Sequence, residues 1–505
     1  MFCRIKSGGV LGIDGFEVDV EVDVSQGIPQ FNIVGLPDKA INEAKDRVRS
    51  ALKNLGYSMP AKKITVNLSP SYLKKQGTLY DLPIAIGILQ TQGVIKVSED
   101  TVILGELSLD GKINKINGVL PIVLSLKEKG YRRFFVPEGN ALEGAIVKGT
   151  EVYGFSTLQE LVEYLKGEIS KSPVEVDVEA LLEEGQNFDI DLSDVYGQEL
   201  AKRAIEVSCA GFHHLLLIGP PGVGKSMLAK RMITILPPLT FEEAIEITRI
   251  YSVAGLLSDP IIKTRPFRSP HHTASDVSLI GGGTVPMPGE ISLAHRGILF
   301  LDEMTEFSRK TLEVLRQPLE DGYVNITRAS AKVRFPAEFL LVGAINPCPC
   351  GNYLNPYKAC TCTPLQIKNY QSKLSGPILD RIDIKVWVEP VEKEDLLNAR
   401  KGESSSEVRK RVERAFQIQR ERFKGSSTRF NGMMKEKEVK KYCVMDSEAK
   451  RLLEYAMDRL HLTGRSYMKV LKVSRTIADL EGEEIIKAHH ISQALQFRVD
   501  EKLLV

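Results

Sequence analysis

A glycine-rich stretch followed by a lysine and a serine is the part of this sequence best suited to chemistry. Residues 219–226 match the phosphate-binding pattern G-x-x-x-x-G-K-[ST] at every fixed position. Glycines let the backbone N–H groups of such a loop turn toward phosphate oxygens, Lys225 supplies a positive charge, and Ser226 offers a hydroxyl to Mg²⁺. An apolar run at 214–218 precedes the loop, and a helical pattern at 226–235 follows it, which adds a favourable dipole for an anion. The pattern therefore predicts a site for ATP and Mg²⁺.

The loop and the first turn of its helix supply the predicted nucleotide contacts. A turn without a ligand is the alternative, but it does not explain why strand, loop and helix occur in this order. The predicted contacts are Gly219, Pro220, Pro221, Gly222, Val223, Gly224, Lys225, Ser226 and Met227.

Two adjacent carboxylates close an apolar run at 297–301. Asp302 is predicted to bind Mg²⁺, directly or through water, because a hard cation prefers carboxylate oxygen. Glu303 is predicted to orient and deprotonate the attacking water. Asn346 ends the next apolar run, at 340–345, and is predicted to hydrogen-bond to the γ-phosphate or to that water. The alternative for Asn346 is an ordinary turn residue.

Three arginines are candidates for binding the charge of the triphosphate. Arg381 is predicted to be a finger that reaches the γ-phosphate held by a neighbouring subunit. The alternative is a surface ion pair with Asp380 or Asp383. Arg465 is a candidate second sensor from the C-terminal helices, and Arg475 competes for that role. The position of Arg465 in the pattern favours it.

Four of the seven cysteines lie in one short window, which argues against a disulfide framework. They form two C-x-C pairs, Cys348 with Cys350 and Cys360 with Cys362. Four thiolates can close a tetrahedral Zn²⁺ site. Reduced thiols without a ligand and an Fe–S cluster are the alternatives. A bound metal would have a structural role, because it would pin the loop that begins at Asn346.

The bulk properties set broad limits. The 505 residues are too many for one core, so three domains are expected. Apolar content of 43% and charged content of 26% are typical of soluble globular proteins. No apolar stretch reaches membrane-spanning length and the N-terminus lacks a signal-peptide core, so we expect a cytoplasmic location and no membrane partner. With a net charge of +2, any basic surface for nucleic acid must be local.

The pattern predicts an α/β fold in four segments. The first is an α/β domain, the second an acidic linker broken by proline, the third a three-layer P-loop ATPase core, and the fourth a C-terminal helical lid. Their bounds are 1–165, 166–190, 191–390 and 391–505. In the first segment we predict strands at 16–24, 63–68, 102–109 and 134–136 and helices at 37–55 and 81–90. In the last we predict helices at 406–423, 447–460 and 468–480.

Two stretches of the ATPase segment depart from a minimal core. The interval between the P-loop and the carboxylate pair is longer than a crossover needs, so 265–290 is predicted to be an insert. Residues 321–335 are predicted to form a hairpin with its tip at 327–330. The positive charges of Arg328 and Lys332 are suited to contact phosphates, with non-specific and salt-dependent affinity. Solvated hairpin charges are the alternative.

The front segment resembles the proteolytic domain of Lon proteases. The resemblance lies in LGELSLDGKI at 104–113, INGV at 116–119 and FVP at 135–137. Lon enzymes use a serine activated by a lysine, and those positions align with 80–82 and with Leu120. Neither residue type is present there. Because a serine nucleophile needs an adjacent base, we expect a non-proteolytic domain for assembly or substrate docking.

The later motifs resemble the magnesium-chelatase-like branch of AAA+ ATPases. They are PHHT at 270–273, PGEISLAHRG at 288–297, DE at 302–303, NP at 346–347 and GPILDRID at 376–383. With the Lon-like front domain, the chain is identified as a member of the YifB/ComM family over essentially its whole length. The resemblance implies a homo-oligomeric ring, usually hexameric, with ATP between subunits and with the insert and the hairpin facing a central channel.

The resemblance also implies a function: ComM proteins are ATP-driven DNA branch-migration motors with helicase-like action in natural transformation. A magnesium-chelatase motor subunit is an alternative, which the front domain disfavours because chelatase motor subunits resemble only the later part of the chain. An ATP-dependent protease is disfavoured by the missing serine and lysine. A protein-remodelling ATPase stays open, since the same ring can pull polypeptide.

Overall fold

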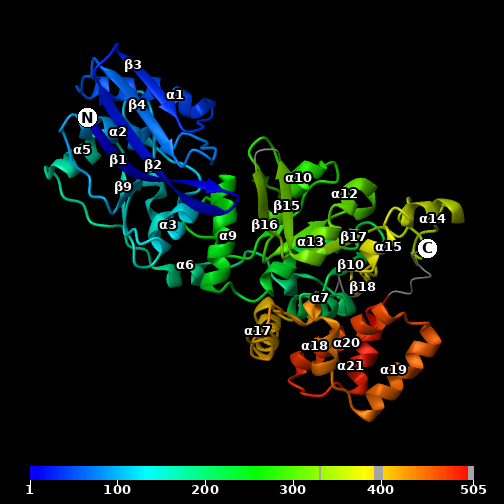
Figure 1. Cartoon of the computed structure of the whole chain (residues 1–505). Helices are drawn as coiled ribbons and strands as arrows, with labels where there is room; N and C mark the ends of the chain where they lie inside the picture. The colour runs from blue at the N-terminus through cyan, green and yellow to red at the C-terminus, as the bar shows by residue number, and fades with distance from the viewer. Residues whose placement is uncertain (329–330, 392–401, 499–505) are drawn as a thin grey trace.

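A computed structural model describes residues 1–328, 331–391 and 402–498 (Figure 1). The blue and cyan front part, the green and yellow core and the orange and red C-terminal helices follow one another across the view. Among the described residues, no helix combines the length and the apolar character that crossing a bilayer requires.

The front part is built on a seven-stranded mixed sheet. Valines at every second position of β2 are buried, which confirms the alternation seen at 16–24. In sheet order the strands are β3 (Gln30–Val34), β4 (Lys63–Ser69), β2 (Asp14–Ser25), β1 (Phe2–Leu11), β5 (Thr101–Ile103), β8 (Arg133–Pro137) and β9 (Glu151–Phe155). The helices are α1 (Lys39–Asn54), α2 (Asp81–Thr91), α3 (Val119–Glu128), α4 (Ala141–Ala145), α5 (Leu158–Lys166) and α6 (Val178–Glu184).

The strand predicted at 102–109 is wrong in its extent. The structure has β5 there and then a separate short ribbon, β6 (Glu106–Leu107) with β7 (Ile113–Asn114). The chain leaves the sheet at Gly105, where the backbone passes so close to Leu82 that an added Cβ would lie 2.9 Å from its Cδ2. The backbone of Gly105 bonds to Leu79, just before α2, and to Leu82, in its first turn, instead of continuing the ladder.

The core is a five-stranded parallel sheet in the order β11 (Phe267–Arg268), β14 (Ile298–Leu301), β17 (Leu340–Ile345), β10 (Leu215–Ile218) and β18 (Ile384–Trp387). Ile218 pairs with Ile345, and Leu301 pairs with Gly343, so the carboxyl ends of these strands lie together. Helix α7 (Glu199–Gly211) precedes β10, and α8 (Lys225–Arg231) follows it. In parallel α/β sheets, ligands bind at this edge.

The remaining helices of the core are short. They are α10 (Asp276–Ile280), α11 (Glu290–Leu293), α12 (Arg309–Glu313), α13 (Arg316–Asp321), α14 (Pro364–Gln371) and α15 (Gly376–Leu379). The predicted insert at 265–290 contains α10 and a small ribbon, β12 (Gly281–Gly282) with β13 (Met287–Pro288), but its first strand, β11, belongs to the core sheet.

The hairpin predicted at 321–335 is confirmed as β15 (Tyr323–Arg328) and β16 (Ala331–Pro336). Val324, Ile326, Val333 and Phe335 are buried on one face, as strand alternation requires. Residues 329–330 of its predicted tip, and the side chain of Arg328, lie outside the described part of the structure.

Helix α9 (Phe241–Ala254) joins the core to the front part, which the sequence did not indicate (Figure 1). Ile247 and Ile250 belong to the apolar core of the front domain. The Ser252 hydroxyl donates to Glu143 at 2.5 Å, and Arg249 donates to the carbonyl of Ile13 at 2.9 Å. The two α/β parts therefore share a packed interface in addition to the chain segment that connects them.

The C-terminal part is helical. Its helices are α17 (Ser405–Arg422), α18 (Glu436–Tyr442), α19 (Ser447–Leu460), α20 (Gly464–Glu481) and α21 (Ala488–Gln496). The three helices predicted there are confirmed, although α20 begins four residues before the predicted start at 468. The Thr463 hydroxyl accepts a hydrogen bond from the Ser466 N–H, and this cap fixes the earlier start.

Candidate nucleotide site

The predicted P-loop, carboxylate pair and asparagine meet at the carboxyl edge of the core sheet. Lys225 Nζ donates to the carbonyls of Gly219 and Pro220, both at 2.7 Å, and to Asn346 Oδ1 at 3.1 Å. The Ser226 hydroxyl donates to Asp302 Oδ2 at 2.6 Å. The structure thus brings together side chains from the segments that follow β10, β14 and β17.

These residues line a cavity of about 320 Å³. The lining residues are Pro221, Gly222, Gly224, Lys225, Ser226, Met227, Asp302, Glu303, Ala344, Ile345 and Asn346. Three of the predicted nucleotide contacts, Gly219, Pro220 and Val223, do not line this cavity. The carbonyls of Gly219 and Pro220 accept hydrogen bonds from Lys225, and Val223 packs into the core.

Lys225 is almost fully buried, with 9% of its surface exposed. Burial lowers the pKa of Lys225 to about 8, while Asp302 and Glu303 oppose this shift. A bound triphosphate would raise the pKa of Lys225 again, because negative oxygens favour the charged amine. The amine is therefore poised to bind an anion.

Glu303 has φ of 48° and ψ of 47°, a left-handed conformation that non-glycine residues rarely adopt. Such a residue stores about 1–3 kcal/mol of strain, and these residues cluster at functional sites. Its backbone N–H donates to Asp302 Oδ1 at 3.0 Å, and its side chain is exposed at the cavity. The two carboxylates therefore have different environments, as a metal ligand and a base require.

Arg381 and Arg465 line a second cavity, of about 950 Å³, between the core and the C-terminal helices. Among the described residues, this cavity and the P-loop cavity have no lining residue in common. Arg381 donates to the Pro377 carbonyl at 2.5 Å and pairs with Glu320, not with Asp380 or Asp383 as the alternative required. Arg465 pairs with Asp380 at 2.9 Å.

Arg475, the competing candidate, is buried inside the helical part. It pairs with Asp479 at 3.0 Å and donates to the carbonyls of Glu483 and Glu484. Its partners are internal, so its geometry is that of a structural residue, whereas Arg465 is exposed.

A buried histidine, which sequence reasoning missed, ties the core to the C-terminal helices. The His213 ring bonds to Asp383 at 2.9 Å through Nδ1 and to Thr476 on α20 at 2.7 Å through Nε2. Burial acts to raise the pKa of Asp383, but His213 and nearby lysines lower it to about 2. The signal available in the sequence was the His-His pair just before β10, but the partners of His213 lie more than a hundred residues away.

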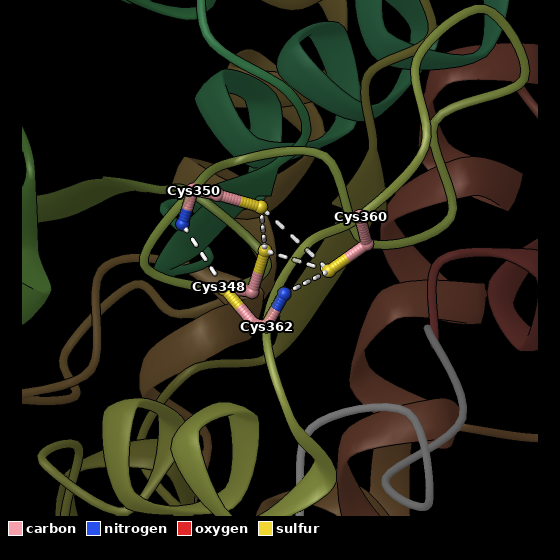
Figure 2. A group of neighbouring side chains, drawn as sticks. All are labelled: Cys348, Cys350, Cys360 and Cys362. Carbon is pink, nitrogen blue, oxygen red and sulfur yellow. Dashed lines mark hydrogen bonds between the residues drawn. The ribbon is translucent and has the colours of Figure 1, made fainter.

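The four clustered cysteines lie together in the loop between β17 and α14 (Figure 2). Cys348 is buried, and the other three are partly exposed. Each can offer one sulfur, and the four sulfurs lie within 4.8 Å of one another. The group is a candidate metal site beside the nucleotide site.

A parallel sheet with a P-loop, a carboxylate pair and a strand-end asparagine at one edge, followed by a helical lid, defines an AAA+ ATPase. Family models agree. The model described as magnesium chelatase, subunit ChlI, matches residues 191–396, and its C-terminal model matches 402–498. A further model, described as subunit ChlI of Mg-chelatase, matches residues 20–140. The expectation that chelatase subunits resemble only the later part of the chain is not supported by this last match.

Full-length relatives fix the family more narrowly. The chain is 43% identical to competence protein ComM of Haemophilus influenzae, over 99% of this chain and 98% of that protein. It is 41% identical to an uncharacterized protein YifB of Salmonella typhimurium over the same shares. The chain belongs to the YifB/ComM family.

The Lon-like character of the front domain is confirmed by a partial relative. An archaeal Lon protease of Methanocaldococcus jannaschii is 30% identical over 31% of this chain and 26% of that protein. Within 80–82, the stretch aligned with the Lon serine, Asp81 is buried and pairs with Arg47 at 2.6 Å. Leu120, aligned with the lysine, is buried in the front core.

Proposed function

We propose that this protein is the subunit of an ATP-hydrolysing ring, with six copies in the family's usual form, that moves on branched DNA during natural transformation and recombination. One observation carries the proposal. Lys225, Asp302, Glu303 and Asn346 line one cavity, whereas the proposed finger, Arg381, lines another and does not line the nucleotide cavity of its own chain. A neighbouring copy would supply the missing guanidinium.

The residues of the cavity divide the work of hydrolysis. Lys225 binds the β- and γ-phosphates, and Glu303 orients the attacking water and accepts its proton. Asn346, held beside Lys225, hydrogen-bonds to the γ-phosphate or to the water. Arg381 from the neighbouring subunit stabilises the charge of the transition state, and Arg465, which shares its cavity, acts beside it.

The site also fits Mg²⁺. The Ser226 hydroxyl and the Asp302 carboxylate lie 2.6 Å apart, and both are the oxygen donors that this ion prefers. When bound, Mg²⁺ neutralises phosphate charge. Ser226 and Asp302 would hold it, directly or through water.

The hairpin β15–β16 supports DNA as the substrate. Its outer face exposes Lys332 and Arg334, while its inner face is apolar. The Arg334 guanidinium stacks on Tyr323 at 3.9 Å, which pre-orders a planar cation for phosphate or base contact. The relative in Haemophilus influenzae is named a competence protein, which agrees with DNA as the substrate.

A DNA-stimulated ATPase assay tests the proposal. Duplex, single-stranded and branched DNA are added at low salt, and branched DNA should raise turnover most. Lys332→Ala with Arg334→Ala should reduce the stimulation and leave basal turnover unchanged. A control that removes two exposed charges elsewhere, Lys53→Ala with Arg451→Ala, should retain it. If none of the three kinds of DNA changes the ATPase turnover, the proposal that DNA is the substrate is refuted.

A magnesium-chelatase motor subunit is the second candidate, because the matching family models carry that description. Such a subunit would hydrolyse ATP without DNA and would respond to partner subunits and a porphyrin. The same assay separates the two.

A further inference from the structure

Three sulfur–sulfur distances in the cysteine cluster are close to the edge of a metal tetrahedron, and all four sulfurs lie within 4.8 Å of one another. Cys348 Sγ lies 3.4 Å from Cys350 Sγ and 3.7 Å from Cys360 Sγ, and the last two are 3.6 Å apart. A tetrahedral ion with Zn–S bonds of about 2.3 Å separates its sulfurs by about 3.8 Å. A disulfide would bring two sulfurs to about 2.05 Å. The spacing therefore suits one ion between four thiolates.

Backbone N–H groups surround these sulfurs. The N–H of Cys350 donates to Cys362 Sγ at 3.4 Å, and the N–H of Cys362 donates to Cys360 Sγ at 3.4 Å. The N–H of Tyr353 donates to Cys348 Sγ at 3.3 Å. Such donors stabilise thiolates and orient metal ligands. The backbone of this loop thus donates hydrogen bonds to three of the four sulfurs, as expected of a loop that folds around a metal site.

The same loop contacts the nucleotide site at two points. Cys348 comes two residues after Asn346, whose side chain accepts from Lys225. Gly351, with φ of 78°, packs against the P-loop so closely that an added Cβ would lie 2.5 Å from Cδ of Pro221. The N–H of Gly351 donates to the Cys348 carbonyl at 2.9 Å, so this contact is built into the cysteine turn.

We propose that Cys348, Cys350, Cys360 and Cys362 bind one Zn²⁺ ion, and that this ion holds Asn346 and Pro221 in place for the triphosphate. Four protein thiolates leave no open position on the ion, so its role is positional and not catalytic. The proposal rests on the nucleotide site described above but not on DNA as the substrate.

Metal analysis is the first test. Protein purified without chelator should contain one zinc per chain. Absence of zinc, or iron with acid-labile sulfide in its place, would overturn the proposal. Protein reconstituted with Co²⁺ should show the intense visible and near-ultraviolet absorption of a tetrahedral thiolate site. Cys360→Ser should lose that absorption, and Cys3→Ala, which removes a buried thiol of the front domain, should retain it.

Nucleotide binding without DNA is the second test. Removing zinc from the intact protein should weaken binding of an ATP analogue about tenfold, the scale of one hydrogen bond to a charged group, and added Zn²⁺ should restore it. Recovery of binding on adding Zn²⁺ would show that the ion positions the nucleotide site, because irreversibly unfolded protein would not recover. Zinc-free protein that binds the analogue as tightly as the zinc form would overturn the link to the P-loop. Loss of DNA stimulation alone would refute the DNA motor and leave this proposal intact.

Discussion

Replacing Lys225 by alanine removes the residue around which the nucleotide cavity is organised. Its amine donates to two carbonyls at 2.7 Å and to Asn346 at 3.1 Å, and only 9% of the residue is exposed. The variant loses the positive charge that would face the phosphates. It also leaves the carbonyls of Gly219 and Pro220 without their donor, so the loop itself becomes less ordered.

The expected loss in affinity follows from these contacts. A hydrogen bond to a charged group contributes about 1.5–3 kcal/mol, so one lost phosphate contact weakens ATP binding about 10- to 150-fold. Disorder of the loop adds to this, and at ordinary concentrations binding should disappear. At an ATP concentration 100-fold above the wild-type Kd, bound ATP adds about 2.7 kcal/mol to the free energy of unfolding of the wild type. For a variant whose Kd is 100-fold weaker, the same concentration should add only about 0.4 kcal/mol.

Isothermal titration with ATP and Mg²⁺ measures the affinity, and thermal unfolding with and without ATP measures the stabilisation. Lys230→Ala is the matched control, because Lys230 is an exposed lysine on the same helix α8. It should bind ATP like the wild type. Wild-type affinity in Lys225→Ala would refute the reasoning, because it would show that the phosphates bind elsewhere.

Three further predictions concern the same machinery. Glu303→Gln should bind ATP normally and lower turnover by at least about 100-fold, since the base is lost; turnover at the wild-type rate would show that another group is the base. Arg381→Ala should reduce the ATPase activity of assembled rings about 1,000-fold, and mixing with wild-type subunits should restore part of it if the arginine acts in trans; absence of rescue would contradict that. Because burial lowers the pKa of Lys225 to about 8, ATP affinity should fall as pH rises through that value. The triphosphate favours the protonated amine, so binding should take up a proton there, measurable by titration in buffers of different ionisation enthalpy.

The local patterns of the sequence were enough to predict the chemistry at the sheet edge. Parallel strands end side by side, so residues that follow apolar runs had to meet, and Lys225, Ser226, Asp302 and Asn346 do lie together. Helix periodicity likewise located α17 and α19, because each buries one face. The second half of α20 is buried nearly all round.

Contacts between distant segments were not predictable in the same way. Helix α9 is amphipathic, but nothing in its pattern indicates that it packs on the front domain. Strand β1 was missed because its alternating buried positions include Ser7 and Gly9, and because Gly8 between them is buried as well, which weakens the apolar signal. His213 is buried between Asp383 and Thr476, and only the folded chain brings these three together.

The segment around Arg381 connects the core sheet, helix α13 and the C-terminal helices. Three charged residues of this short segment bind three different elements: Asp380 binds Arg465 of the lid helix, Arg381 binds Glu320 of α13, and Asp383 binds His213 beside β10. Helix α13 leads directly into the hairpin β15–β16. In the proposed ring, a γ-phosphate of the neighbouring subunit would compete with Glu320 for the Arg381 guanidinium. If the phosphate displaced Glu320, the ion pair between α13 and the segment at Arg381 would be lost. Under the proposed function, this exchange of partners would connect the nucleotide with the hairpin that is proposed to contact DNA.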